Sequence, residues 1–134
     1  MLEVYTNNAT VAADEVIPLT NVKVQKGPSS TVAGNTINLN RRGVYLVSAD
    51  GTAVASAQGI VGFSLYKDGV EDPSAVTAVT AASGATAACG FTTMIQVDRD
   101  ATPAPGSYPV QLQVINGGIE ADWHINVTVY RLPC

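Results

Sequence analysis

Apolar and polar residues alternate along most of this chain with a period of two. The alternation is clear from Thr36 to Asn40, where Ile37 and Leu39 share one side. A period of two is typical of β-strands that bury one face. On this basis we predict strands at residues 2–6, 17–19, 22–25, 36–40, 44–49, 60–67, 70–80, 91–97, 110–115 and 122–132. No segment has the spacing of an amphipathic helix of ordinary length.

Glycine, proline and asparagine residues mark the expected turns. Asp68-Gly69 predicts a tight hairpin between strands 60–67 and 70–80, because this pair favours positive φ angles. Pro73 restricts the second of these strands to a sheet edge or a bulge. Turns are also expected at Asp50-Gly51 and at residues 116–118, and the Gly-, Pro- and Ser-rich segments 26–35 and 98–108 are predicted to be loops.

The alanine-rich segment 75–88 is the one place where a helix competes with a strand. Interspersed valine and threonine lower helix propensity, and Gly84 interrupts the segment. We therefore interpret it as strand, loop and strand. Short strands with Gly/Pro turns indicate an all-β fold, an antiparallel β-sandwich or jelly roll, and the length of 134 residues fits a single domain over residues 1–134.

Charged residues are scarce and predominantly acidic. They form 13% of the chain, against about 25% in a typical globular protein, while 46% of residues are hydrophobic. With so few charges, either much of the surface is buried against other subunits or it is covered by small neutral residues, and we favour the first. The net charge of −4 argues against nucleic acid and anionic membranes as partners. The Arg41-Arg42 pair is interpreted as a solvated corner between two strands, with a salt bridge to a neighbouring subunit as the alternative.

Targeting and cysteine patterns add two expectations. The N-terminal stretch lacks the basic and apolar regions of a signal peptide, and no run reaches the roughly 18 apolar residues of a membrane span. We therefore expect synthesis in the cytosol without membrane insertion. Cys89 and Cys134 lie far apart and have no metal-ligand spacing.

The most distinctive chemistry lies on the last predicted strand. Trp123, Ile125, Val127 and Val129 share one face, which we assign to the core, and His124, Asn126, Thr128 and Tyr130 share the other. With no second histidine and no nucleophile at motif spacing, we expect a structural interface rather than a catalytic site.

A cation site is weighed and not favoured. Asp98, Asp100, Glu120 and Asp122 could supply oxygen ligands, but the segment 98–106 lacks the spacing of a calcium loop. We expect neither a metal nor a cofactor.

Three segments carry a family resemblance that spans roughly residues 20–132. GVYLVSADG, FSLYKDGV and NVTVYRL resemble the jelly roll shared by tumour necrosis factor (TNF), the complement globular head and the C-terminal heads of bacterial collagen-like spore-surface proteins. A G-x-Y-x-apolar strand corresponds to Gly43, Tyr45 and Val47, the central hairpin to Asp68-Gly69, and the closing strand to residues 127–132. The segment 98–108 replaces a shorter turn of that family.

The resemblance implies a compact threefold trimer with one face of the inner sheet at its axis. Transferred to this sequence, Tyr45 and Val47 enter the core. The implied trimer interface consists of Val44, Leu46, Ser48, His124, Asn126, Thr128 and Tyr130. The same topology makes the strand starting at Cys89 parallel to the last strand, so that Cys89 and Cys134 lie about 20 Å apart and form no intrachain disulfide.

The opening VYTNN…VAAD…IPL and the terminal cysteine are also similar to small proteins encoded among the structural genes of prophages in gut Firmicutes. We therefore expect a non-enzymatic homotrimer, a phage or prophage virion component such as a head decoration, fibre or baseplate element, assembled in the host cytoplasm with possible contacts to other virion proteins. The alternative is a receptor- or carbohydrate-binding trimeric head that uses the loops at 26–35, 98–108 and 116–122, with Tyr108 and Trp123 nearby.

Overall fold

The computed structural model describes residues 1–100 and 109–133, which form ten strands and no helix. In chain order the strands are β1 (Leu2–Val11), β2 (Asn21–Gln25), β3 (Ser30–Ala33), β4 (Thr36–Leu39), β5 (Gly43–Ala55), β6 (Gly59–Lys67), β7 (Val70–Ala81), β8 (Thr86–Val97), β9 (Val110–Asn116) and β10 (Ala121–Arg131).

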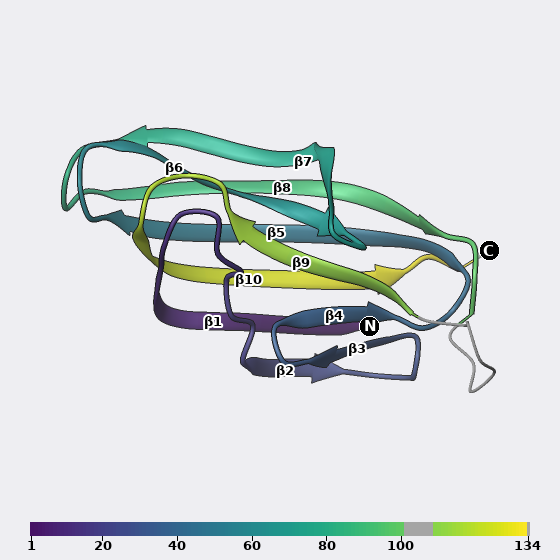
Figure 1. Cartoon of the computed structure of the whole chain (residues 1–134). Coiled ribbons are helices and arrows are strands. Elements are labelled where there is room, and N and C mark those ends of the chain that lie inside the picture. Colours follow the sequence, from purple (N-terminus) through teal and green to yellow (C-terminus); the bar gives the residue numbers. More distant parts are fainter. Residues whose placement is uncertain (101–108, 134) are drawn as a thin grey trace.

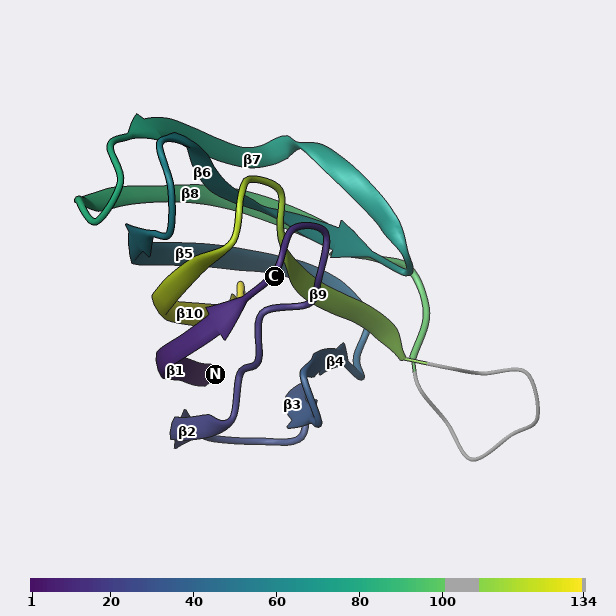
Figure 2. The same cartoon turned by 60° about the vertical axis from the view of Figure 1, so that its left-hand side comes forward.

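The strands form two five-stranded antiparallel sheets, one in the order β2-β1-β10-β5-β8 and the other β3-β4-β9-β6-β7. We call them the inner and the outer sheet. Figures 1 and 2 show the two sheets stacked as a sandwich, with β7 and β8 side by side along one long edge. The chain passes between the sheets repeatedly, so several paired strands are distant in sequence; β1 and β10, the first and the last strand, lie side by side. This architecture confirms the predicted antiparallel β-sandwich.

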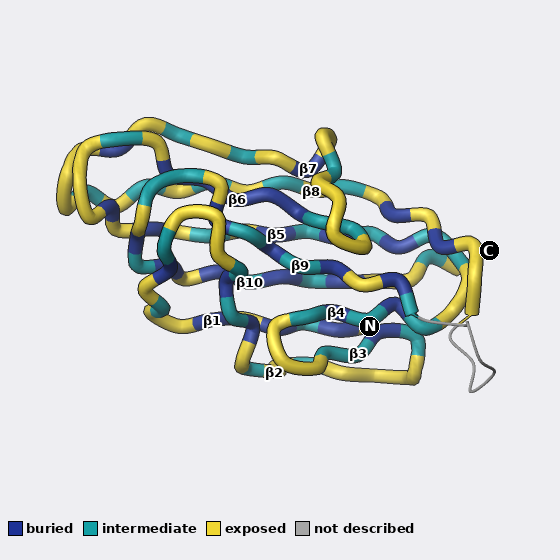
Figure 3. Tube along the Cα trace, in the orientation of Figure 1, coloured by how far each residue is buried: buried dark blue, intermediate teal, exposed yellow. Residues whose placement is uncertain are grey.

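The core lies between the sheets and follows the predicted alternation (Figure 3). Trp123 is fully buried and packs edge-on against Phe63, with ring centroids 5.4 Å apart. Ile125, Val127 and Val129 are buried beside it, as are Tyr45 and Val47 of β5. The assignment of these faces from the sequence is therefore confirmed.

The predicted hairpin and its proline are also confirmed. Asp68 and Gly69 have φ angles of 51° and 83° and connect β6 to β7. Pro73 lies in β7, the edge strand of the outer sheet, close to a register shift between Ser64 and Tyr66 of β6. Segment 75–88 is strand, turn and strand, because β7 ends at Ala81 and β8 begins at Thr86.

The predicted turn at Asp50-Gly51 is wrong. β5 continues through both residues to Ala55, paired with β10 on one side and with β8 on the other. A central strand saturates its backbone hydrogen bonds through such pairing, which removes the need for a turn. Gly51 is required for another reason, because a Cβ there would lie 2.7 Å from Ile125 Cγ1 in the core.

The N-terminal third also departs from the prediction. The segment 26–35 is not entirely loop, because Ser30–Ala33 forms β3 and pairs with β4 across the Gly34-Asn35 turn. β1 extends to Val11 through a bulge at residues 7–8, where Asn8 has a φ of 60°. Residues 17–19 form no strand; Ile17 and Leu19 are buried beside an isolated bridge between Val16 and Ile115.

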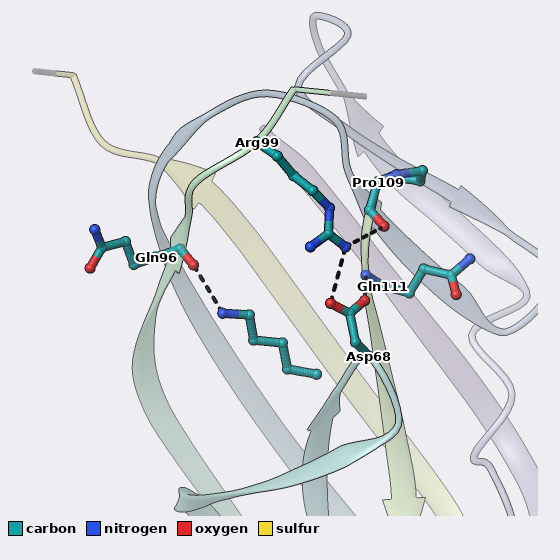
Figure 4. A network of polar contacts seen from close by, with 6 residues as sticks. Asp68, Gln96, Arg99, Pro109 and Gln111 are labelled. Atoms are coloured by element: carbon teal, nitrogen blue, oxygen red, sulfur yellow. Dashed lines mark hydrogen bonds and ion pairs between the residues drawn. The ribbon is translucent and has the colours of Figure 1, made fainter. Parts of the chain in front are cut away.

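A polar network joins the two sheets at the end where β6 and β8 finish (Figure 4). The backbone N–H of Asp68 donates to Gln111 O at 2.8 Å, and Asp68 Oδ1 accepts from Gln111 N at 2.9 Å. Arg99, which follows β8, donates to Asp68 Oδ2 at 3.1 Å. Lys67 Nζ donates to Gln96 O at 3.1 Å. The β6–β7 hairpin turn of the outer sheet is thereby fixed to the end of β8 in the inner sheet and to the residues that follow it.

Candidate functional site

The outward face of the inner sheet gathers the residues that the sequence singled out as an interface. On β5 these are Val44, Leu46 and Ser48, and on the adjacent β10 they are His124, Asn126, Thr128 and Tyr130. All seven are exposed or half-buried, and they alternate with fully buried neighbours. In the pairing of β10 with β5, Tyr130 lies opposite Leu46 and Thr128 lies opposite Ser48. The fold therefore places all seven on one face.

This face is apolar at one end. Tyr130, Leu46 and Met94 lie in one row across β10, β5 and β8. Met94 is 63% exposed and Tyr130 is 43% exposed. Exposed side chains of this size in one row are typical of an interaction surface. Met94 was not among the residues predicted for this face, although its alternation with Ile95 within the predicted strand 91–97 was a usable signal.

The middle of the face carries hydroxyl and amide groups. Ser48 and Thr92 share a hydrogen bond of 3.3 Å between their hydroxyl oxygens. Asn126 Nδ2 donates to Glu3 Oε2 at 2.8 Å. The outward side chains of β5, β8 and β10 include two carboxylates, Asp50 and Asp122, and one imidazole, but no lysine or arginine. The face is thus nearly uncharged over β10, β5 and β8.

An open depression of about 540 Å³ lies on this face around His124. Its lining includes Tyr5, Asp50, Thr52, His124 and Asn126. The side chains beside it are small, because Ala88 and Gly90 occupy the neighbouring outward positions of β8. The depression offers hydrogen-bond donors and acceptors without the nucleophile and base pairing that covalent catalysis needs.

Cys89 does not supply that nucleophile. It is half-buried and hydrogen-bonded to Thr77 of the outer sheet, and burial raises the pKa of its thiol above the ordinary value of 9.0. A raised pKa leaves little thiolate at neutral pH. Cys89 is a free thiol, and Cys134 lies outside the described residues, so the predicted absence of an intrachain disulfide stays a prediction.

The carboxylates weighed as metal ligands are dispersed in the fold. Asp122 accepts a hydrogen bond from Thr10 Oγ1 at 2.5 Å, whereas Asp100 accepts from Arg42 N at 2.7 Å near the opposite end of β5 and β10. Among the described residues, no group of three histidine, cysteine or acidic side chains is arranged to hold a metal ion.

The three loops considered for a sugar- or receptor-binding head do not meet at one end, because only the described residues 26–29 and 98–100 lie near the start of β5. Residues 26–29 lie beside the start of β5, because Ser29 O accepts from Tyr45 Oη at 3.3 Å. Residues 117–120 lie at the opposite end of β9 from residues 98–100. Trp123 is fully buried and offers no stacking surface, while residues 101–108, Tyr108 included, lie outside the described part of the chain.

Arg41 and Arg42 form the predicted corner between β4 and β5. Tyr45 Oη donates to Arg41 O at 2.7 Å, and Arg131 Nε donates to Arg42 O at 3.1 Å. Burial raises the pKa of Tyr45 above its ordinary value. The corner is therefore held by the backbone of these two arginines, and both side chains are exposed.

Comparison with known proteins identifies the fold. No protein-family model matches the sequence, and no curated protein matches it. Among solved structures, the globular domain of zebrafish complement 1qA protein is similar with a TM-score of 0.70 and 4% identity, over 98% of this chain and 96% of that one. The Eiger TNF of S. frugiperda is similar with a TM-score of 0.66 and 12% identity, over 99% and 95%.

The PRD1 vertex protein P5 is similar with a TM-score of 0.62 and 14% identity, over 98% of this chain and 72% of that one. In addition, no described segment forms a helix long and apolar enough to cross a membrane. The similarity covers nearly the whole chain and includes complement and TNF heads at very low identity, so the chain has a TNF-like jelly-roll fold.

Proposed function

We propose that this chain is a non-enzymatic structural protein whose single domain assembles as a homotrimer through the outward face of the inner sheet. The observation that carries this proposal is the row formed by exposed Tyr130, half-buried Leu46 and exposed Met94 across three strands. Burying apolar surface contributes about 25 cal/mol per Å², and three copies meeting at an axis would each cover this row. The TNF-like fold supports the same arrangement, because the resemblance implies a threefold axis on this sheet.

The polar part of the face fits the same role. Val44, Leu46 and Tyr130 would pack at one end of the axis, whereas Ser48, Thr128 and Asn126 would form hydrogen bonds between copies farther along it. His124 would lie at the end of the interface, beside the depression around Asp50. In such an interface, the apolar section buries hydrophobic surface and the hydrogen-bonding section fixes how the copies are aligned with one another.

The proposed place of the trimer is a phage or prophage virion, as a head decoration, fibre or baseplate element assembled in the host cytoplasm. The similarity to the PRD1 vertex protein supports a virion role. The proposal includes no metal, cofactor, nucleic acid or membrane. It includes contacts with other virion proteins as a secondary part.

The solution mass measured by light scattering tests the trimer. We expect about three times the chain mass of 13.8 kDa at low micromolar concentration. Leu46→Asp should reduce the mass to that of one chain, because it would place three buried carboxylates near the axis. Val76→Asp is the matched control, since Val76 is also an exposed apolar strand residue but lies on the outward face of the outer sheet. A monomeric wild-type chain would refute the trimer.

A second candidate function is ligand recognition by the depression around His124. The observation that favours it is the volume of about 540 Å³ lined by Tyr5, Asp50, His124 and Asn126. This function needs the face to be open, whereas the trimer covers it. A monomeric chain that binds glycans on an array, and loses binding with Asn126→Ala, would support ligand recognition. Absence of binding by a monomer would contradict it.

A further inference from the structure

The charged side chains are divided between the two ends of the sandwich. All seven lysines and arginines lie in the half where β5 begins and β10 ends, on the right in Figure 1. Lys23 lies on β2 and Lys26 just after it, Arg41 and Arg42 precede β5, Lys67 ends β6, Arg99 follows β8 and Arg131 ends β10.

The carboxylates are distributed differently. Six of the eleven share the basic half: Glu3, Asp68, Glu71, Asp72, Asp98 and Asp100. Asp50 lies midway along β5. The remaining four, Asp14, Glu15, Glu120 and Asp122, occupy the opposite end, where no basic residue lies. Because residues 101–108 and 134 include no charged side chain, this distribution accounts for the whole net charge of −4.

The basic end presents a compact arginine corner, which we define as Arg41, Arg42 and Arg131. Arg131 is 89 residues from Arg42 in sequence, and its guanidinium group donates through Nε and Nη2 to Arg42 O. Arg42 N donates to Asp100 Oδ1 at 2.7 Å, and Arg41 O accepts from Tyr45. These contacts use only the backbone of Arg41 and Arg42. Neither of their guanidinium groups has a hydrogen bond or ion pair among the described residues.

The acidic end is held in a defined shape by one buried side chain. Asn116 Nδ2 donates to Val11 O at 3.0 Å, to Ala12 O at 3.2 Å and to Ile119 O at 3.0 Å. Asn116 N also donates to Glu15 O at 2.9 Å. The loop carrying Asp14 and Glu15 is thereby fixed beside the loop carrying Glu120. Three of the four carboxylates here are exposed, and that of Asp122 is half-buried.

We propose that a second copy of the assembly docks end to end, with the arginine corner of one copy against the acidic end of the next. The chain itself carries both complementary surfaces, which favours a second copy over an unrelated acidic partner. Ions at physiological strength screen charge beyond about 8 Å, so the repulsion between net-negative copies is damped while contacts at the ends persist. The contact is heterologous and does not close on itself, so it produces linear stacks.

This inference goes beyond the proposed trimer because it uses the ends of the sandwich rather than the outward face of the inner sheet. It holds for a stack of trimers or of single chains. Sedimentation velocity separates the two proposals: the mass of the smallest species at low concentration reports the trimer, and larger multiples at high concentration report the stacking.

The test compares sedimentation at about 0.1 M and about 1 M NaCl, where the Debye length falls from roughly 10 to 3 Å. We expect multiples of the smallest species in low salt and their loss in high salt. The variants R41E/R42E and E15K/E120K should each lose self-association, because the first makes the arginine corner acidic and the second removes the net negative charge of the acidic end. An equimolar mixture of the two should recover it.

A matched pair of variants separates a docking surface from a general effect of net charge. R41A/R42A and V76E/A78E each lower the net charge of the chain by two, but Val76 and Ala78 are exposed in the middle of β7. We expect R41A/R42A to lose most of the association and V76E/A78E to keep it. Equal loss in both, no recovery in the mixture, or a wild-type chain that never exceeds its smallest species would each overturn the proposal.

Discussion

Arg99 Nη2 lies 3.1 Å from Asp68 Oδ2, across 31 residues of sequence and between the two sheets. Asp68 lies at the first position of the β6–β7 turn with a φ of 51°, and its other carboxylate oxygen accepts from Gln111 N. One side chain therefore stabilises a left-handed turn, joins that turn to β9 and contacts the segment after β8.

We expect the backbone contact of Asp68 to contribute more stability than the ion pair. Asp68→Ala should lower the free energy of unfolding by about 1–2 kcal/mol, because it removes the acceptor for Gln111 N–H and places alanine at positive φ. Asp68→Asn should cost less than about 1 kcal/mol, since asparagine tolerates this conformation and keeps an acceptor. Urea unfolding measures both. An equal loss in the two variants would mean that the ion pair dominates.

Trp123 provides a test of the core. Its Nε1 is buried without a hydrogen-bond partner in the described residues, while its ring packs against Phe63. Trp123→Ala should cost about 3–5 kcal/mol through the cavity it leaves. Trp123→Phe should cost clearly less, because it keeps an aromatic ring and removes an unpaired donor. Because both substitutions remove the single tryptophan of the chain, urea unfolding followed by circular dichroism measures the two variants against the wild-type chain. Equal destabilisation by both substitutions would contradict this account.

Gly62 is required by the approach of β6 to β7. A Cβ there would lie 2.2 Å from Thr77 O and 2.8 Å from Ala78 Cα. Gly62→Ala should therefore force the strands apart and lower stability by about 1–3 kcal/mol. Gly117→Ala is the control, because a Cβ at Gly117 has no neighbour within 4 Å and should change stability by less than about 0.5 kcal/mol. Thermal melting of the two variants checks the difference, and similar melting temperatures would count against the steric argument.

Tyr45 makes the stability of the fold sensitive to alkaline pH. Burial raises the pKa of its hydroxyl above 10.0, so the unfolded chain loses this proton at lower pH than the folded chain does. The contribution of Tyr45 is therefore complete below pH 10 and is lost as pH rises through the folded pKa. Tyr45→Phe should lose about 1 kcal/mol at pH 7, from the hydrogen bond to Arg41 O, and should show a weaker decline above pH 10. Urea unfolding across this range tests the slope; identical slopes would exclude Tyr45 as a source.

Most of the strands and their buried faces could be predicted from the local sequence. Alternation acts over a few neighbouring residues, so Trp123 and Ile125 could be assigned to the core and His124 to the surface without knowledge of the pairing. The Asp68-Gly69 hairpin was equally local, because the turn needs only residues that tolerate positive φ. The seven proposed interface residues followed from the same alternation combined with the family resemblance.

The features that depend on pairing between distant strands could not be predicted from the local sequence. Asp50-Gly51 has the local pattern of a turn, but β8 and β10 pair with it on both sides and extend the strand. Met94 joined Leu46 and Tyr130 only through sheet register, and Arg131 reached Arg42 only because β10 ends where β5 begins. The separation of charge between the two ends has the same origin. Antiparallel pairing brings strand ends from remote parts of the chain to the same end of the sandwich. A local sequence pattern cannot predict this arrangement.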